Sequence, residues 1–353
     1  MQTQRNRKFG VTDPIFEIRN ASVTFDMDRG ESRVMDSVDI DIERGEILGV
    51  VGESGSGKSM FASALLDAIP EPGQLFGDIT FHPESGEEID LLDQTEEEIK
   101  EIRWEDIAMV FQGAMSSFNP TMTIGDHFKE TLRTHGYDVA EGMERGEDLL
   151  SQLYLEADQV FDSYPHELSG GMQQRALLAL SLILDPEVLV MDEPTAALDL
   201  LMQRSIIELI RKIGNERDLT IVFITHDLPL VANLADRLGV LYAFEFVEVG
   251  DAYEVLTNAK HPYTRALLNS TPNLETPREE MKPIEGKAPD PVSVPDGCTY
   301  HPRCPMADET CVASDPQFQA GTVGDSNHQA KCHYVDDVAG EIPLNLQEVT
   351  HDE

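Results

Sequence analysis

The apolar and polar residues of the chain follow two different patterns. Residues 16–25 and 38–42 alternate apolar and polar side chains, as half-buried antiparallel strands do. Short continuous apolar runs predict buried parallel strands instead. Runs of this kind are 47–51, 107–111, 188–191 and 220–225. A further strand is predicted over 77–81, and helical patterns occupy 95–102, 124–161, 176–184 and 200–213. This succession of strands and helices favours an α/β protein.

The first apolar run leads directly into Gly-Glu-Ser-Gly-Ser-Gly-Lys-Ser, residues 52–59. A strand, a glycine-rich loop and a helix in this order form a phosphate-binding loop, because the glycines let backbone N–H groups face a polyphosphate. Lys58 would reach the β and γ phosphates, and the Ser59 hydroxyl would ligate Mg²⁺. A glycine-rich turn without a ligand is the alternative, which the flanking strand and helix disfavour. The residues assigned to the nucleotide are Gly52, Ser54, Gly55, Ser56, Gly57, Lys58 and Ser59.

A second anion site is predicted where the helix around 176–184 begins. Leu-Ser-Gly-Gly-Met-Gln-Gln-Arg, residues 168–175, comes directly before that apolar run. Ser169 alone would be explained as a helix N-cap. Gly170 and Gly171 weaken the first turn of a helix, so their presence favours contact with an anion at the positive helix end.

Two of the buried strands end in titratable residues. Asp192 and Glu193 follow the run 188–191, and His226 follows the run 220–225. Open α/β sheets bind their ligands at the carboxyl ends of the strands. Asp192 is therefore assigned to Mg²⁺, Glu193 to activation of the attacking water and His226 to the γ phosphate. Ion pairs for the carboxylates and a structural role for the histidine are the alternatives.

Two further side chains are weaker candidates. Phe25 ends the first alternating segment, where its ring would stack on a nucleotide base or belong to the core. Gln112 ends the apolar run 107–111, where a side-chain amide can reach a metal ion or a catalytic water. A single Gln in that position is more commonly an ordinary surface residue.

The composition of the chain is strongly acidic. Its 353 residues include 66 Asp and Glu against 26 Lys and Arg, which gives a formal net charge of −40. Such a surface repels phosphate backbones and disfavours a nucleic acid partner. The hydrophobic content of 41% opposes disorder, so we interpret the charge as that of a halophile's protein, such as one from a halophilic archaeon, whose self-repulsion is screened in molar salt. No run is long enough to span a bilayer, and the first residues lack a signal peptide's apolar region, so we expect a cytosolic chain.

Taken together, these motifs resemble the full set of an ABC ATPase, in the order of that family. The set is residues 52–59, Gln112, 168–173, 188–193, Asp199 and His226. The resemblance implies a P-loop sheet, an antiparallel β subdomain, an inserted helical subdomain, and ATP with Mg²⁺ as ligands. It also implies a head-to-tail pair of nucleotide-binding domains in which Ser169, Gly170 and Gly171 serve the partner's ATP. Gln173 and Asp199 are assigned to the nucleotide on the same ground.

A narrower resemblance, to the ATP-binding subunits of dipeptide, oligopeptide and nickel importers, covers residues from about 15 to 335. It rests on Phe111-Gln112 with the segment 117–120, on His-Pro-Tyr-Thr-Arg-Ala-Leu-Leu at 261–268, and on a cysteine-containing tail. The resemblance implies two transmembrane permeases, an extracytoplasmic substrate-binding protein, and a second ATPase subunit that usually differs from the first. It places the chain at the cytoplasmic face of the membrane. The solute stays open between dipeptides, oligopeptides, nickel and sugars.

Two positions depart from the pattern of that family. Gly113-Ala114 replaces the commoner Asp-Pro, which affects the loop expected to contact a permease. Phe244 stands where a turn glycine is usual, so we expect an altered hairpin there. The division predicted for the chain is a mobile lead-in at 1–14, a nucleotide-binding domain at 15–260 with the helical subdomain at about 113–170, a C-terminal extension at 261–335, and an acidic tail at 336–353.

The four cysteines all lie in a Pro-rich segment with too few apolar residues for a core of its own. They are Cys298, Cys304, Cys311 and Cys332. In a reducing compartment they favour metal binding over disulfides, although their separations are too wide for paired Cys-x-x-Cys knuckles. Four thiolates suit a [4Fe-4S] cluster, which some members of the resembling family bind. Zn²⁺, with His301 or His333 as further ligands, is the second alternative, and free thiols are the third.

The competing class of function is an ABC protein that acts on ribosomes or DNA. Such proteins usually contain two cassettes or a long coiled-coil insertion, neither of which is present, and the charge of −40 opposes the idea. An exporter ATPase is disfavoured by the segment 261–268 and the cysteine tail. We therefore predict an importer ATPase in which Glu193, His226 and Gln112 are the catalytic residues.

Overall fold

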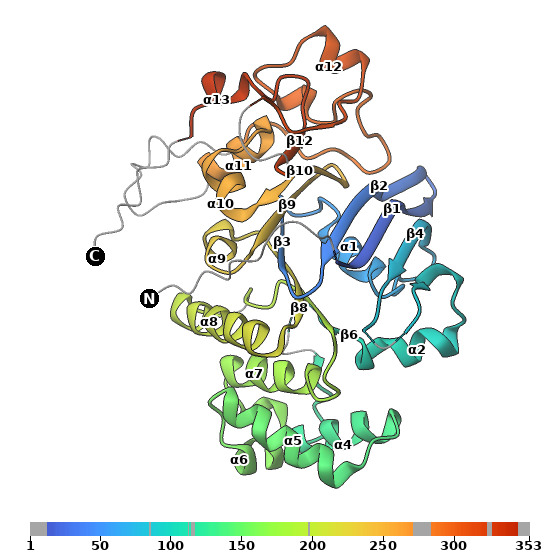
Figure 1. Ribbon diagram of the computed structural model, residues 1–353, viewed down its shortest axis with the longest axis vertical. Helices are drawn as coiled ribbons and strands as arrows, with labels where there is room; N and C mark the ends of the chain where they lie inside the picture. The colour runs from blue at the N-terminus through green and yellow to red at the C-terminus, as the bar shows by residue number, and fades with distance from the viewer. Residues whose placement is uncertain are drawn as a thin grey trace.

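The computed structural model describes residues 13–84, 86–111, 113, 117–196, 198–270, 284–322 and 327–344. The strands in these residues form an eight-stranded sheet in the order β11-β12-β10-β9-β3-β8-β7-β6 and a four-stranded sheet in the order β2-β1-β4-β5. Figure 1 shows the small sheet in blue and cyan on one side, a group of green helices at one end, and the orange and red C-terminal segments at the other end.

The middle of the large sheet is parallel. β3 (Ile47–Val51) lies between β8 (Thr220–Thr225) and β9 (Arg237–Tyr242), and β7 (Val188–Asp192) and β6 (Ile107–Val110) continue the sheet beyond β8. Every residue of β3, β6, β7 and β8 is buried. The apolar runs are therefore the buried parallel strands that the sequence predicted, and their carboxyl ends share one edge of the sheet.

The small sheet is antiparallel and shares an apolar core with α1 (Lys58–Ala64). Its strands are β2 (Gly30–Glu43), β1 (Pro14–Met27), β4 (Gln74–Phe81) and β5 (Ile89–Asp90). The predicted alternation is interrupted by a register shift between Ile18 and Ala21, where Asn20 has a φ of 48°. Such a bulge bends the strand, so apolar side chains face the core on both sides of it.

Three helices that follow the end of β6 contribute their buried apolar residues to the main core cluster. They are α4 (Ile124–Thr134), α5 (Val139–Gln152) and α6 (Ala157–Asp162). Gly136, with a φ of 74°, and Tyr154, with a φ of 58°, lie at the two breaks between them. Phe128 and Phe161 pack edge to face with ring centroids 5.2 Å apart. Together with α7 (Gly170–Ser181), these helices lie at the end of the molecule opposite the C-terminal segments (Figure 1).

The remaining elements are η1 (Leu91–Asp93), α2 (Glu96–Glu105), η2 (Pro165–Glu167), α8 (Leu200–Arg217), α9 (Leu228–Ala232), β10 (Glu245–Asp251), α10 (Ala252–Thr257), α11 (Pro262–Ser270), η3 (His301–Arg303), α12 (Glu309–Ala313), β11 (Phe318–Gln319), β12 (Gln329–Lys331) and α13 (Val338–Glu341).

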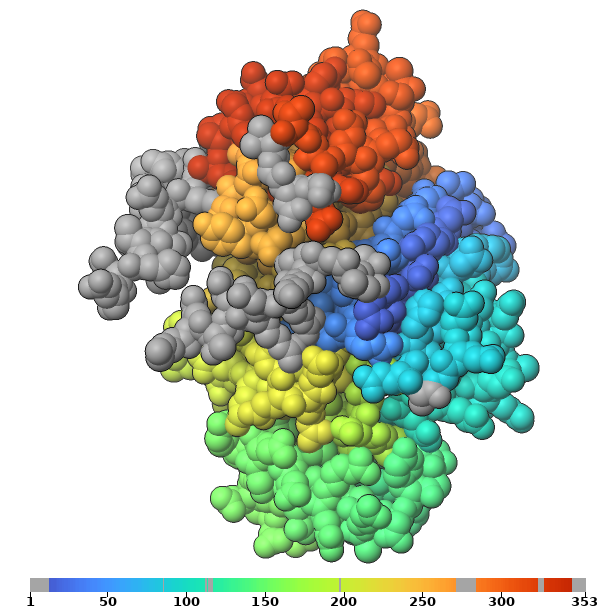
Figure 2. All heavy atoms as spheres, in the orientation of Figure 1, coloured from blue at the N-terminus to red at the C-terminus, as the bar shows by residue number. Residues whose placement is uncertain are grey.

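The C-terminal segments extend the edge of the large sheet. β12 pairs with β10. Cys298, Tyr300 and Cys311 belong to the main core cluster. In Figure 2 the red and orange atoms lie directly against the rest of the protein. The segment uses the core of the cassette because its own apolar residues are few.

The hairpin between β9 and β10 corrects one expectation. Tyr242 pairs with Glu245 across a tight two-residue turn, and Ala243 and Phe244 adopt φ values of 49° and 76°. The left-handed conformation costs a non-glycine residue about 1–2 kcal/mol. The Phe244 ring is buried, its N–H donates to Ser56 O at 3.1 Å, and its carbonyl accepts a further backbone hydrogen bond. These contacts offset the strain, so the hairpin is kept despite the missing glycine.

Candidate functional site

The phosphate loop connects β3 to α1, and two glycines determine its path. At Gly52 a β-carbon would lie 2.2 Å from the carbonyl oxygen of Leu241, so no larger residue fits. Gly57 is the N-cap of α1 and has a φ of 105°, a conformation that favours glycine. A β-carbon there would lie 2.5 Å from Val34 O. The surrounding backbone therefore holds the loop closely on both sides.

Lys58 lies inside the loop that it was predicted to serve. Its Nζ donates to the carbonyl oxygens of Gly52 and Glu53, each at 2.9 Å. Burial lowers the pKa of Lys58, whereas the charges of Glu193, Asp192 and Glu53 raise it. The ammonium group is thus within electrostatic reach of three carboxylates and is placed to interact with an anion in the loop.

Asp192 ends β7 with its carboxyl group buried beside Ser59. Burial raises the pKa of Asp192, the hydrogen bond from Ser59 lowers it, and the nearby charges of Glu193 and Lys58 act in opposite directions. Among the described residues, neither Asp192 Oδ1 nor Ser56 Oγ has a hydrogen-bond partner. An unpaired buried carboxylate oxygen beside a hydroxyl is a ligand set suited to Mg²⁺ at a phosphate loop. The residues present therefore fit Mg²⁺ and a nucleotide.

Glu193 and His226 come from neighbouring strands and meet at the sheet edge. His226 Nδ1 lies 2.7 Å from Glu193 Oε1, and the side chains are 65% and 11% exposed. Glu193 has a φ of 49°, and its N–H donates to Ile224 O at 2.9 Å, which fixes this left-handed backbone. The pair places a shielded carboxylate, able to accept a proton from water, behind an imidazole that is open to a phosphate.

The second predicted anion site lies at the start of α7. Ser169 is exposed and caps the helix by accepting from Met172 N at 3.4 Å. A β-carbon at Gly171 would lie 2.9 Å from the side chain of Met202, so the close approach of α8 explains that glycine. Gly170 is partly exposed and meets only Leu198, at 3.9 Å. Packing therefore accounts for one glycine of the pair and leaves the other facing outward.

Gln173 and Asp199 lie near this segment but bond to their own chain. The Gln173 amide is buried and donates to Pro165 O at 2.6 Å and Leu168 O at 3.2 Å, so it supports the turn before α7. Asp199 is the N-cap of α8 and accepts from Leu201 N at 3.0 Å. Both residues shape the segment, and their assignment to the nucleotide stays a prediction.

Phe25 and Gln112 were the weaker candidates. Phe25 lies half-buried on β1, and a β-carbon at Gly73 would come within 2.6 Å of its ring. Gln112 lies outside the described residues. The edge of the Phe25 ring thus lies against Gly73 of its own domain, and its contact with a base stays a prediction.

Sequence reasoning missed contacts that the loop makes with distant residues. Arg303 pairs with Glu53, and the hydroxyl of Tyr263 accepts from the backbone N–H of Glu53. These partners are 250 and 210 positions away in the chain. No local pattern marks such contacts, although Arg303 directly precedes a cysteine that the sequence had singled out.

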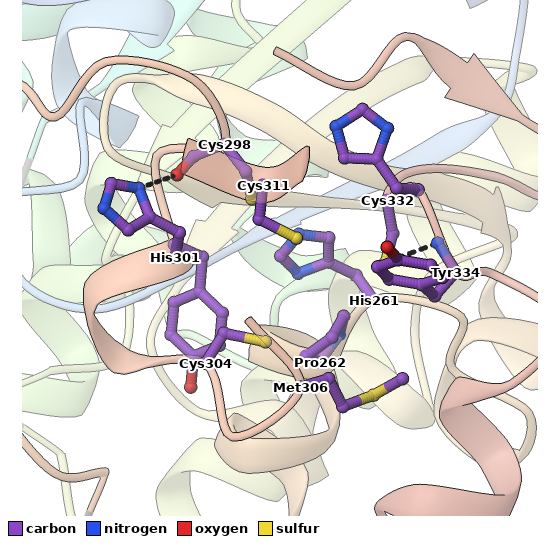
Figure 3. Close-up of a pocket in the computed structure, with 11 residues that line it drawn as sticks. His261, Pro262, Cys298, His301, Cys304, Met306, Cys311, Cys332 and Tyr334 are labelled. Carbon is purple, nitrogen blue, oxygen red and sulfur yellow. Dashed lines mark hydrogen bonds between the residues drawn. The ribbon is translucent and has the colours of Figure 1, made fainter. Parts of the chain in front are cut away.

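The four cysteines line a single cavity in the C-terminal segments. Figure 3 shows the Cys304 and Cys311 sulfurs facing the same space from separate segments, close to His261. Cys298 and Cys332 line the cavity as well, and all four are free thiols. The fold therefore brings together the residues that the sequence singled out.

The thiols have backbone hydrogen bonds but not the spacing of a metal site. Tyr334 N donates to Cys332 Sγ at 3.4 Å, and backbone N–H groups two residues ahead bond Cys298 and Cys304 in the same way. Burial raises the pKa of Cys298 to about 11 and that of Cys332 to about 12, so both are protonated at neutral pH. In the part of the chain that the structure describes, no three His, Cys, Asp or Glu side chains are grouped to hold a metal ion. The predicted cluster is not supported by this arrangement.

The fold and the loop define an ATP-binding cassette of the ABC class. Residues 35–196 match the family model described as ABC transporter. The ATP-binding cassette MJ0796, solved as a post-hydrolysis dimer bound to ADP and Pi, aligns with a TM-score of 0.59 and 25% identity over 67% of this chain and 98% of that chain. The chain belongs to the ABC transporter family, and the predicted α/β fold of an ABC ATPase is confirmed, whereas the metal-stapled C-terminal extension stays a prediction.

Within that family the chain belongs to the dipeptide and oligopeptide transport ATP-binding subunits. Residues 247–311 match the model described as oligopeptide/dipeptide transporter, C-terminal region. The dipeptide transport ATP-binding protein DppD of Caldanaerobacter subterraneus is 38% identical, covering 86% of this chain and 93% of the relative. DppD of Escherichia coli is 36% identical, covering 94% of this chain and 99% of the relative. The oligopeptide transport ATP-binding protein OppD of the same species is 38% identical, covering 86% of this chain and 89% of the relative. A halophilic origin is not shown by these similarities.

Proposed function

We propose that the chain is the ATP-hydrolysing subunit of an importer for dipeptides, oligopeptides or a related solute. The observation that carries this proposal is the union, in one chain, of an ATP-binding cassette with the C-terminal region of oligopeptide and dipeptide transporters. We also propose that the nucleotide-binding domain ends near residue 260 and that the C-terminal extension ends near residue 335. No helix among the residues that the structure describes is both long and apolar enough to cross a membrane. Attachment to the cytoplasmic face would therefore depend on permeases.

The residues of the site have distinct roles in this proposal. The loop amides and Lys58 bind the triphosphate, and Ser59 with Asp192 holds Mg²⁺, which would neutralise charge on the phosphates. Glu193 accepts a proton from the attacking water, for which its 11% exposure and fixed backbone prepare it. His226, now hydrogen-bonded to Glu193, would turn its exposed ring to the γ phosphate.

A second ATPase subunit completes the site. Ser169 and Gly170 face outward at the start of α7, and the neighbouring Leu200 and Leu201 are 75% and 80% exposed. Exposed leucines beside an anion-binding helix start suit a protein interface that closes over ATP. We propose a different ATPase chain as partner, with two permeases and an extracytoplasmic substrate-binding protein. Closure is driven by contacts made only when ATP is present.

The cysteine cavity is proposed to bind a metal group, with a [4Fe-4S] cluster preferred to Zn²⁺. Four thiols on one cavity and the N–H···S hydrogen bonds support a thiolate site. Binding would displace the thiol protons and draw the cysteine segments closer together. A brown preparation made without oxygen, with equivalent iron and sulfide per chain, would support the cluster. A colourless preparation that contains zinc alone would contradict it.

Capture of the closed complex tests the transport function. Glu193→Gln should lower ATP turnover about 100-fold or more, because the base is lost while nucleotide binding remains. The tagged variant is purified with ATP and high salt from gently solubilised membranes, and its partners are identified by mass spectrometry. Glu208→Gln, an exposed change on α8, is the matched control. Two permeases and a sister ATPase would support the importer, whereas ribosomal or DNA-repair proteins without permeases would contradict it.

A further inference from the structure

Glu53, the second residue of the phosphate loop, is bound by two side chains from far along the chain. Arg303 Nη1 lies 2.7 Å from its Oε2, and Arg303 Nη2 lies 3.1 Å from its Oε1. The Glu53 backbone N–H donates to the hydroxyl oxygen of Tyr263 at 2.8 Å. The loop that receives phosphate is therefore fastened at one residue by α11 and by the segment that contains the cysteines.

Arg303 is also held in place by residues outside the loop. Its guanidinium lies over the rings of Tyr242 and Tyr300, 5.6 and 5.9 Å from their centroids. Its Nε donates to the carbonyl oxygen of Glu285 at 2.7 Å. The Arg303 side chain is 5% exposed, against 27% for Glu53. A planar guanidinium that is stacked, enclosed and doubly paired has a fixed position, unlike a surface ion pair.

An unpaired carboxylate at Glu53 would oppose the binding of a nucleotide. Lys58 Nζ bonds the Glu53 carbonyl oxygen, and the Glu53 carboxylate acts electrostatically on Lys58. A polyphosphate in the loop would bring several negative charges to the same place. At about 7 Å and an effective dielectric constant near 20, one such charge pair would weaken binding roughly fiftyfold, and solvent screening at the partly exposed Glu53 reduces this to about tenfold. The positive charge of Arg303 cancels this repulsion.

We propose that Arg303 is a positioning residue for ATP. It neutralises Glu53 and, together with Tyr263, fixes the phosphate loop, so the nucleotide affinity of the cassette depends on its C-terminal extension. Arg303 acts through Glu53 and takes no part in the chemistry at Asp192 and Glu193. This role goes beyond the transport function and requires only that ATP binds at the loop.

Binding of ATP labelled with a methylanthraniloyl group to the full-length chain tests the proposal. Arg303→Gln should raise the Kd about tenfold, and Arg303→Lys, which keeps the charge but not the two-point contact, should give an intermediate value. The double variant Glu53→Gln/Arg303→Gln should recover most of the affinity that Arg303→Gln loses, because the charge that needed cancelling is gone and only the fastening of the loop by Arg303 is missing. Arg29→Gln is the matched control, since Arg29 pairs with Asp290 at 2.6 Å and with no loop residue.

Kinetics and folding controls separate positioning from general damage. In ATPase assays the KM for ATP should rise in Arg303→Gln while kcat changes less than about twofold, because the hydrolytic residues are untouched. Circular dichroism checks the fold of each variant. If Arg303→Gln does not fold, Arg303→Lys and Glu53→Gln still decide the question, and Glu53→Gln alone should bind within about threefold of the wild type, because it removes the repulsion and the ion pair together.

Three results would overturn the proposal. They are wild-type affinity in a folded Arg303→Gln variant, a double variant as weak as Arg303→Gln, and a tenfold loss in Glu53→Gln alone. A wild-type chain that binds no labelled ATP would instead overturn the nucleotide function itself. The two failures are therefore distinguishable in the same experiment.

Discussion

Glu248 is the buried carboxylate that joins the C-terminal segments to the cassette. It is fully buried in β10. Its Oε1 accepts from Lys260 N at 2.5 Å and from His328 Nε2 at 2.7 Å, and its Oε2 accepts from His261 N at 3.0 Å. The partners lie just before α11 and just before β12, so one side chain holds three segments together.

Removal of this carboxylate should destabilise the fold strongly. A hydrogen bond to a charged group contributes about 1.5–3 kcal/mol, and breaking a buried charged network costs about 3–5 kcal/mol. Glu248→Ala should therefore lower the free energy of unfolding by about 4 kcal/mol. Glu248→Gln keeps the size and one accepting oxygen, so it should lose about 2 kcal/mol.

Urea unfolding in constant high salt measures this difference. Circular dichroism follows the whole chain, and the fluorescence of Trp104, the single tryptophan, follows the cassette. Glu309→Gln, an exposed change on α12, is the matched control and should shift stability by less than about 0.5 kcal/mol. A loss below about 1 kcal/mol for Glu248→Ala at an unchanged m-value would refute the reasoning.

Three further outcomes are expected. Dilution from molar salt to about 50 mM should unfold the protein, because a net charge of −40 is then poorly screened, and an unchanged circular dichroism spectrum would contradict this. Burial raises the pKa of Glu46 from its usual value of 4.5 to about 7, although the nearby charge of Arg237 lowers it. The stability of the wild type relative to Glu46→Gln is therefore greatest below about pH 4.5 and should fall by roughly 3 kcal/mol as pH rises to 7; equal pH profiles in urea titrations would oppose it. Gly52→Ala places a β-carbon against Leu241 O and should weaken binding of labelled ATP more than tenfold, which a wild-type binding curve would disprove.

Much of the cassette could be predicted because its signals are local. Buried parallel strands need continuous apolar runs, and the phosphate loop needs glycines at fixed positions, so both can be predicted from short stretches of sequence. The same logic brought Asp192, Glu193 and His226 together, since parallel strands end at one edge of a sheet. Only the 2.7 Å separation of Glu193 and His226 and the unequal exposure of these two side chains required the structure.

Other features depend on partners that no short window contains. Phe244 was expected to disturb its hairpin, yet burial of the ring and backbone hydrogen bonds with Ser56 and Asp36 hold it at a positive φ. Gln173 was assigned to the nucleotide by resemblance, and its amide nitrogen donates to carbonyls five and eight residues away, while its Oε1 has no partner among the described residues. The contacts that decide these positions are formed only after the chain has packed.

The sequence by itself determined the buried parallel strands β3, β6, β7 and β8, the phosphate loop and the residues at the strand ends, because each follows from periodicity or from a short motif. It also singled out the four cysteines, which the fold gathers on one cavity. Only the tertiary structure decided that Arg303 lies against Glu53 and that Glu248 joins the C-terminal segments. A charge pair across 250 positions leaves no pattern along the chain. It arises because the tail has too small an apolar core of its own and must pack on the cassette, which brings its charged residues to the nucleotide site.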